Sequence, residues 1–117
     1  MLNANPQPLT SAIMDFMLPL IEQHRTEIAA LCRRHHVRKL SLFGSVLRSD
    51  FGPQSDVDVL VEFDPQHTPG FFRLSEMEKE LSRLFDGRRV DLRTPQDLSR
   101  YFRSHVLAHS EVQYAAS

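Results

Sequence analysis

The segment VDVLVEF at residues 57–63 constrains the fold more than any other part of the sequence. Its valines alternate with other residues, and this period of two is typical of a β-strand with one buried face. The valines lie on the buried side, whereas Asp58 and the preceding Asp56 share the opposite side. Adjacent carboxylates repel each other, so this strand predicts a site where a cation neutralises them.

The rest of the sequence predicts elements in the order helix, strand, strand, helix, strand, helix. Apolar residues recur at helical spacing over residues 20–36 and 71–85, and shorter signals predict the other elements. This order indicates an α/β (α+β) fold in which a small mixed sheet is packed with helices. The 117 residues fit one domain, with residues 1–10 as a flexible tail. The shorter elements expected are strands ending at Gly44 and around Val90–Leu92, a helix over 94–102 and an edge strand near 112–114.

Gly44 and Ser45 form a corner between the first expected strand and one helical turn. Such a corner presents backbone N–H groups and a hydroxyl to an anion, and glycine lets a phosphate approach the backbone closely. Arg48 lies one turn later and adds a guanidinium that can bind phosphate oxygens. Together with the two aspartates, this corner predicts a site for a triphosphate complexed to Mg²⁺.

Asp91 is the candidate for a third carboxylate. In the segment RRVDLR it lies on the side of its strand opposite Val90 and Leu92. If that strand neighbours residues 57–63, Asp91 joins the two aspartates across the sheet. Three carboxylates can hold two metal ions about 3.5–4 Å apart, and oxygen ligands suit Mg²⁺ or Mn²⁺.

Gly44-Ser45, followed after ten residues by Asp56-Val57-Asp58, resembles the signature of the nucleotidyltransferase superfamily typified by DNA polymerase beta. The likeness is to its minimal nucleotidyltransferase (MNT) group, the antitoxins encoded beside HEPN-domain toxins in prokaryotes. It extends from the helix before LFGSV through GRRVDLRTP to VLAHSEVQYA. One departure from the family pattern is Ser49, which stands after Arg48 where a glycine is expected.

The resemblance implies a nucleotidyltransferase fold and an enzyme that moves AMP from ATP to a hydroxyl side chain of a HEPN toxin. It implies that Gly44 and Ser45 bind the triphosphate, as does Arg48. It makes Asp56, Asp58 and Asp91 the ligands of two Mg²⁺ or Mn²⁺ ions, with Asp91 assisting deprotonation of the acceptor hydroxyl. A non-catalytic antitoxin that neutralises its partner by stoichiometric binding is the alternative.

Composition excludes several other classes of protein. The formal net charge of −1 disfavours nucleic acid as a partner. The single cysteine, Cys32, excludes an intrachain disulfide and fits a reducing cytoplasm. No apolar run approaches the roughly 20 residues that span a membrane. We therefore expect a cytoplasmic protein, and both a homodimer and a hetero-oligomer fit the sequence.

Three smaller features have competing interpretations. His105 and His109 are spaced like a zinc pair, but no third ligand accompanies them, so surface histidines are the favoured interpretation. Phe71 and Phe72 begin a helix as part of the core stripe, or they line a purine pocket or a partner surface. Arg89 and Arg93 share the side of Asp91, either for charge balance or to contact the triphosphate or the acceptor.

Overall fold

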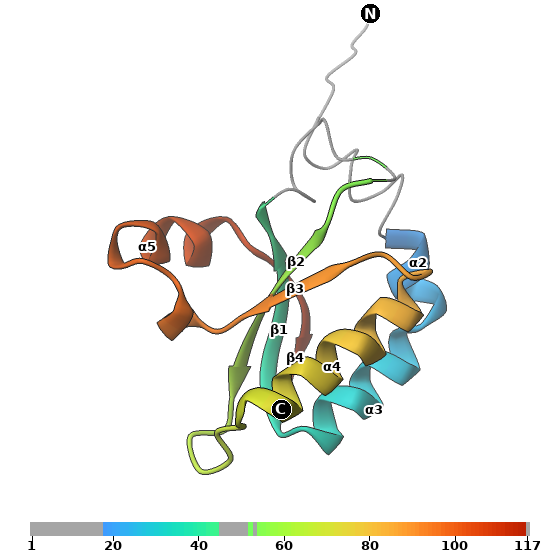
Figure 1. The fold of residues 1–117 in the computed structure, drawn as a ribbon, viewed down its shortest axis with the longest axis horizontal. Coiled ribbons are helices and arrows are strands. Elements are labelled where there is room, and N and C mark those ends of the chain that lie inside the picture. The colour runs from blue at the N-terminus through green and yellow to red at the C-terminus, as the bar shows by residue number, and fades with distance from the viewer. Residues whose placement is uncertain (1–17, 45–51, 53, 117) are drawn as a thin grey trace, which may run out of the picture.

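A mixed β-sheet with helices packed against it forms the body of the protein (Figure 1). The computed structural model describes residues 18–44, 52 and 54–116. The predicted α+β class with a small mixed sheet is confirmed. In chain order the elements are α2 (Leu18–Gln23), α3 (Arg25–Arg34), β1 (Val37–Phe43), β2 (Val57–Phe63), α4 (Phe71–Leu84), β3 (Val90–Arg93), the 3-10 helix η3 (Pro95–Asp97), α5 (Arg100–His109) and β4 (Glu111–Ala115).

The described strands have the order β3-β2-β1-β4. β1 is antiparallel to both β2 and β4, whereas β2 and β3 are parallel. A parallel pair needs a long crossover connection, and α4 provides it between β2 and β3. The expected edge strand near residues 112–114 is confirmed as β4.

The core lies between one face of the sheet and helices α2, α3 and α4. Val57, Val59 and Val61 of β2 are completely buried there, as their alternation predicts. Burying a side chain of this size stabilises the fold by about 1.5–3 kcal/mol. The helices contribute side chains at helical spacing to the same cluster: Ile21, Ile28, Leu31, Cys32, Met77 and Leu81.

The opposite face of the sheet carries the polar residues of β2 and β3. Asp58 and Glu62 are half-buried there, and Leu60 between them is buried although it lies outside the core cluster. η3 lies against β2. Helix α5 lies away from α3 and α4 (Figure 1) and has no buried residue. The fold therefore places β2 and β3 side by side, with their carboxylates on the face of the sheet that helices α2–α4 do not cover.

Two helices differ from the sequence expectation. The helix expected over residues 20–36 is divided at His24 into α2 and α3, and it ends at Arg34 because His36 adopts a positive φ of 61°. The helix expected over residues 94–102 is a short 3-10 turn, η3, followed by α5. Ser99 accepts a hydrogen bond from the Tyr101 N–H at 3.2 Å and so caps α5, which continues to His109.

Candidate functional site

Asp58 and Asp91 lie on neighbouring strands at paired positions. The parallel register of β2 and β3 matches Asp58 with Asp91. Adjacent strands are about 4.8 Å apart, and matched residues point to the same face. Both aspartates are half-buried on the face opposite the valine core. The expectation that the third strand neighbours residues 57–63 and brings Asp91 beside Asp58 is confirmed.

Asp56 lies just before β2 and is exposed. The N–H of Val57 donates to the carbonyl oxygen of Arg89 at 2.8 Å, which fixes where β2 joins β3. The Nε of Arg89 lies 4.0 Å from Oδ2 of Asp56. Asp56 therefore lies where the pairing of β2 with β3 begins. The guanidinium of Arg89, from the segment before β3, lies beside it.

Gly44 directly follows β1 and lies next to Asp58. Phe43 is matched with Asp58 in the antiparallel pair, so Gly44 follows directly. Gly44 has a φ of +68°, and a Cβ added there would lie 2.4 Å from Oδ2 of Asp58. Both the left-handed backbone and the close carboxylate require glycine at this position. The other residues of the predicted triphosphate corner, Ser45 and Arg48, lie outside the described residues.

Two of the three aspartates, Asp56 and Asp91, form ion pairs with arginine side chains. Both Nε and Nη2 of Arg93 lie 3.2 Å from carboxylate oxygens of Asp91. The side chains of Arg93 and Asp91 are 48% and 39% exposed, so this pair contributes only about 0–1 kcal/mol to stability. The pairs with Arg89 and Arg93 can therefore open at little cost.

The donor atoms of the three aspartates suit Mg²⁺ or Mn²⁺, because hard cations prefer carboxylate oxygens. In the described part of the chain, no three His, Cys, Asp or Glu side chains are grouped so that they could hold a metal ion. Asp56 and Asp91 each have an arginine side chain beside them instead. The residues fit a divalent cation in chemistry, and binding would require these pairs to open.

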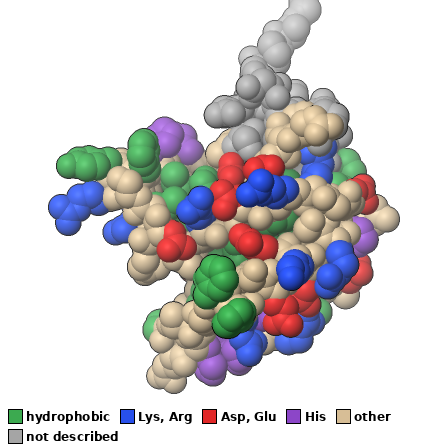
Figure 2. Space-filling view, in the orientation of Figure 1, with side chains coloured by type: hydrophobic (Ala, Val, Ile, Leu, Met, Phe, Trp, Pro, Cys, Tyr) green, Lys and Arg blue, Asp and Glu red, His purple; other side chains and the backbone are tan. Residues whose placement is uncertain are grey.

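Figure 2 shows how charge is distributed on this face, where acidic and basic side chains intermingle over β2 and β3. The arginines beside Asp56 and Asp91 reduce the repulsion between neighbouring carboxylates. The same guanidiniums would attract a triphosphate, because paired N–H donors bind phosphate oxygens strongly. The face thus combines groups for a cation with groups for an anion.

Arg88 is a positioning residue that the sequence reasoning missed. Its Nη1 lies 2.9 Å from the carbonyl oxygen of Gly52 and 3.4 Å from that of Ser55. Its own carbonyl oxygen accepts a hydrogen bond from Ser82 Oγ at 2.6 Å. Arg88 therefore ties the segment before Asp56 to α4. Nothing in the sequence distinguishes it from the adjacent Arg89.

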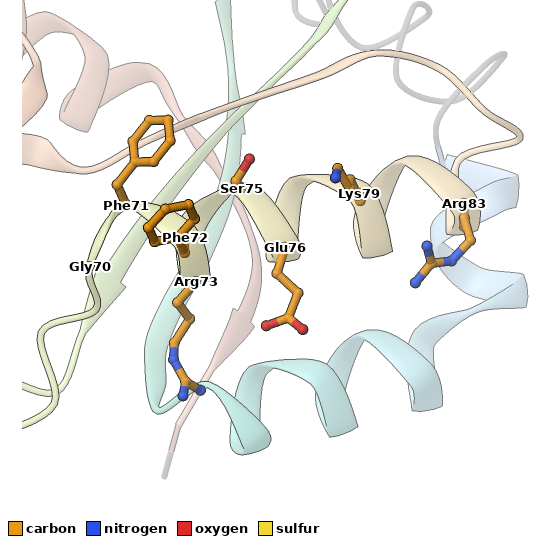
Figure 3. A pocket seen from close by; sticks show the side chains of 8 residues that line it. All are labelled: Gly70, Phe71, Phe72, Arg73, Ser75, Glu76, Lys79 and Arg83. Atoms are coloured by element: carbon orange, nitrogen blue, oxygen red, sulfur yellow. The ribbon is translucent and has the colours of Figure 1, made fainter.

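Phe71 and Phe72 belong to a separate surface on α4. Their side chains are 77% and 87% exposed. With Arg73, Lys79 and other residues of α4 they line a hollow of about 800 Å³ (Figure 3), and none of the three aspartates contributes to it. Figure 3 shows both rings projecting from the first turn of α4, away from Lys79. The prediction that Phe71 and Phe72 belong to the core is therefore wrong. The hollow that they line is separate from the three aspartates.

His105 and His109 are exposed on α5, as expected of surface histidines. Their rings stack with centroids 4.2 Å apart, and Nδ1 of His109 lies 2.9 Å from the carbonyl oxygen of His105. None of the described helices combines the length and the apolar character that a membrane span requires.

The sequence profile of the nucleotidyltransferase domain family matches residues 24–113. The protein adenylyltransferase MntA of Thermococcus cleftensis is 36% identical over 73 residues, which are 62% of this chain and 68% of that protein. A solved structure provisionally described as a minimal nucleotidyltransferase superposes with a TM-score of 0.65 and 30% identity, covering 80% of this chain and 92% of the other. An MNT antitoxin solved in complex with a tri-AMPylated HEPN toxin, from Shewanella oneidensis, shares the fold with a TM-score of 0.57 at 20% identity, covering 81% of this chain and 72% of that chain.

Proposed function

The chain belongs to the nucleotidyltransferase domain family, and from this membership we propose that it transfers AMP from ATP to a hydroxyl side chain of a partner protein. The partner proposed is a HEPN-domain toxin, which AMP transfer would silence, so that the chain acts as a cytoplasmic antitoxin. Two findings about related proteins support this: a relative is named a protein adenylyltransferase, and a protein of the same fold was solved with an AMPylated HEPN toxin.

The observation that carries the proposal is the pairing of Asp58 with Asp91 beside Gly44. Gly44, with Ser45 and Arg48, would bind the triphosphate on the β1 side of Asp58. Asp56, Asp58 and Asp91 would hold two Mg²⁺ or Mn²⁺ ions. When bound, these ions would neutralise charge on the triphosphate and lower the pKa of the acceptor hydroxyl.

The reaction is a displacement at the α-phosphorus of ATP. The acceptor oxygen forms a bond to this phosphorus, and the bond from phosphorus to the oxygen bridging the β-phosphate breaks. Pyrophosphate leaves with the electron pair of that bond, and the hydroxyl proton moves to the carboxylate of Asp91. Catalysis thus depends on positioning and on charge stabilisation.

The test is to incubate the purified chain with the HEPN-domain protein expected beside its gene, Mg²⁺ and ATP labelled at the α-phosphate. Label should move to the partner with the unaltered chain and not with the Asp56→Ala/Asp58→Ala variant. Glu76→Ala removes an exposed acid of α4 and is the matched control, which should transfer label normally. Equal neutralisation of the toxin by the unaltered chain and the double variant, without label, would instead establish a stoichiometric antitoxin.

A further inference from the structure

Strand β2 is longer than the strand beside it. β3 is matched with β2 only from Val57 to Leu60, where Leu60 is opposite Arg93. β2 continues to Phe63, still matched with β1 on its other side. The last three residues of β2, Val61–Phe63, therefore have an edge with no strand beside it in the described part of the chain.

The backbone groups of this edge point outward, toward the position that β3 vacates. The N–H of Val57 donates to Arg89 on the β3 side, whereas the N–H of Asp64 donates to the His36 carbonyl oxygen on the β1 side. Because backbone groups alternate along a strand, those of Val61 and Phe63 point to the β3 side.

The chain that follows β3 does not supply donors to this edge. The N–H of Thr94 donates to Oδ2 of Asp97 at 3.0 Å, within the capping box of η3. Pro95 has no N–H at all. The pairing of Leu60 with Arg93 uses the N–H of Val61, so the groups of this edge left open to an added strand are the carbonyl oxygen of Val61 and the backbone of Phe63.

A hollow of about 600 Å³ lies along this edge. Val61–Phe63 form one part of it, and the loop after β2, the start of α4 and η3 form the rest. Its lining combines apolar with polar residues and includes no Lys or Arg; its charged side chains are the carboxylates of Glu62, which lies 3.7 Å from Nζ of Lys39, and of Asp97, which caps η3. These properties favour an extended segment that carries apolar and basic side chains.

The position of the hollow suits an acceptor. In a displacement at phosphorus the attacking and leaving oxygens are roughly in line. Gly44 lies on the β1 side of Asp58, so pyrophosphate would leave on that side and the acceptor would approach from the β3 side. The hollow is on the β3 side. Glu62, which lines it, lies four residues along β2 from Asp58, a distance of about 13 Å.

We propose that this hollow binds the acceptor segment of the protein substrate, which adds to the edge of β2 as a short extended strand. Main-chain hydrogen bonds to the Val61 carbonyl oxygen and to Phe63 would supply affinity, and the apolar lining residues with the two carboxylates would select a basic, apolar sequence. The acceptor hydroxyl lies a few residues beyond this strand, over Asp58 and Asp91. This assignment rests on the proposed function, because it takes the acceptor to be a protein.

The first test is kinetic and uses the HEPN-domain protein as substrate. Gln96 is an exposed residue of η3 that lines the hollow. Gln96→Arg adds bulk and a positive charge there, so the KM for the HEPN-domain protein should rise about tenfold or more while the KM for ATP stays unchanged. Gln23→Arg makes the same change at the exposed end of α2 and should leave both constants unchanged. An unchanged KM for the protein substrate in Gln96→Arg would overturn the proposal.

The second test does not depend on activity. Amide hydrogen exchange at Phe63, followed by NMR, should slow about tenfold when the HEPN-domain protein is added at saturation, and less in Gln96→Arg. Protection of Phe63 without label transfer would retain the docking site and refute the proposed function. Label transfer without protection of Phe63 would support the proposed function and refute the docking site.

Discussion

Asp58 of β2 and Asp91 of β3 are paired across the parallel junction of the sheet, so their carboxylates share one face at neighbouring positions. Like charges at neighbouring positions repel each other, and the ion pair of Asp91 with Arg93 offsets part of this repulsion. The cation and triphosphate chemistry proposed for this face would give this pairing a role.

Asp91→Asn should separate catalysis from stability. The isosteric amide cannot accept the hydroxyl proton, so transfer of AMP should fall by about 10²-fold or more. The free energy of unfolding should change by less than about 1 kcal/mol, because the pair with Arg93 is exposed. Transfer assays and urea unfolding measure the two effects. Asp86→Asn, at an exposed acid in the turn after α4, is the control, and equal losses of activity in both variants would contradict the assignment.

Gly44→Ala should destabilise the protein and displace the carboxylate of Asp58. The left-handed backbone alone costs about 1–2 kcal/mol when a Cβ is added. Gly87→Ala is a matched control, because Gly87 also has a positive φ but a Cβ there meets nothing within 4 Å. Both variants should lose stability, whereas AMP transfer should fall in Gly44→Ala alone. Normal transfer by Gly44→Ala would show that the close contact with Asp58 has no catalytic role.

Glu80→Gln should destabilise the fold in a pH-dependent way. Burial opposes the charge of Glu80, yet the hydrogen bond with His35 and the nearby Arg34 lower its pKa from the ordinary value. A lowered carboxyl pKa stabilises the fold above the unfolded pKa, and this contribution is lost as the pH falls below about 4.5. The variant should lose about 1–3 kcal/mol near neutral pH, since His35 is buried and bonded to Glu80.

Urea unfolding of Glu80→Gln at several pH values measures this effect. The difference from the unaltered chain should shrink toward zero in acid. Glu76→Gln, an exposed position of the same helix, should show no such difference at any pH. A constant difference across the pH range would refute the role given to the charge of Glu80.

Cys32 should be unreactive in the folded protein. Burial raises the pKa of its thiol to about 12, and the nearby Arg33 opposes this only in part. Because the thiolate is the reactive form, Ellman's reagent at mildly alkaline pH should label the native protein about 10²-fold or more slowly than the denatured chain. The raised pKa also means that its contribution to stability is present below pH 9 and is lost between pH 9 and 12. Rapid labelling of the native protein would contradict this environment.

The fold was largely predictable where one physical signal dominated. Alternating valines predicted β2 and its buried face, and helical spacing predicted α4 over nearly its observed length. The division of the first helix at His24 and the separation of η3 from α5 were not predictable, because they depend on the backbone conformation at His24 and on tertiary contacts around the Ser99 cap. Local sequence signals do not determine such choices, and tertiary contacts override them.

The candidate site was predictable in its residues and less so in its contacts. The period of two placed Asp91 on the polar side of its strand, and the parallel register brought it beside Asp58. The pairing of Arg89 with Asp56, and of Arg93 with Asp91, depends on side-chain geometry across two strands. The role of Arg88 likewise required knowing which carbonyl groups lie near it.

β2 has a neighbour on each side where it carries Asp58, with β1 on one side and β3 on the other. Its valines are completely buried beneath that position. Strands enclosed in this way open only when the whole domain does. The Asp58 carboxylate should consequently keep its place during gradual heating, so that thermal inactivation coincides with cooperative melting and is not preceded by local loosening of the acidic pair.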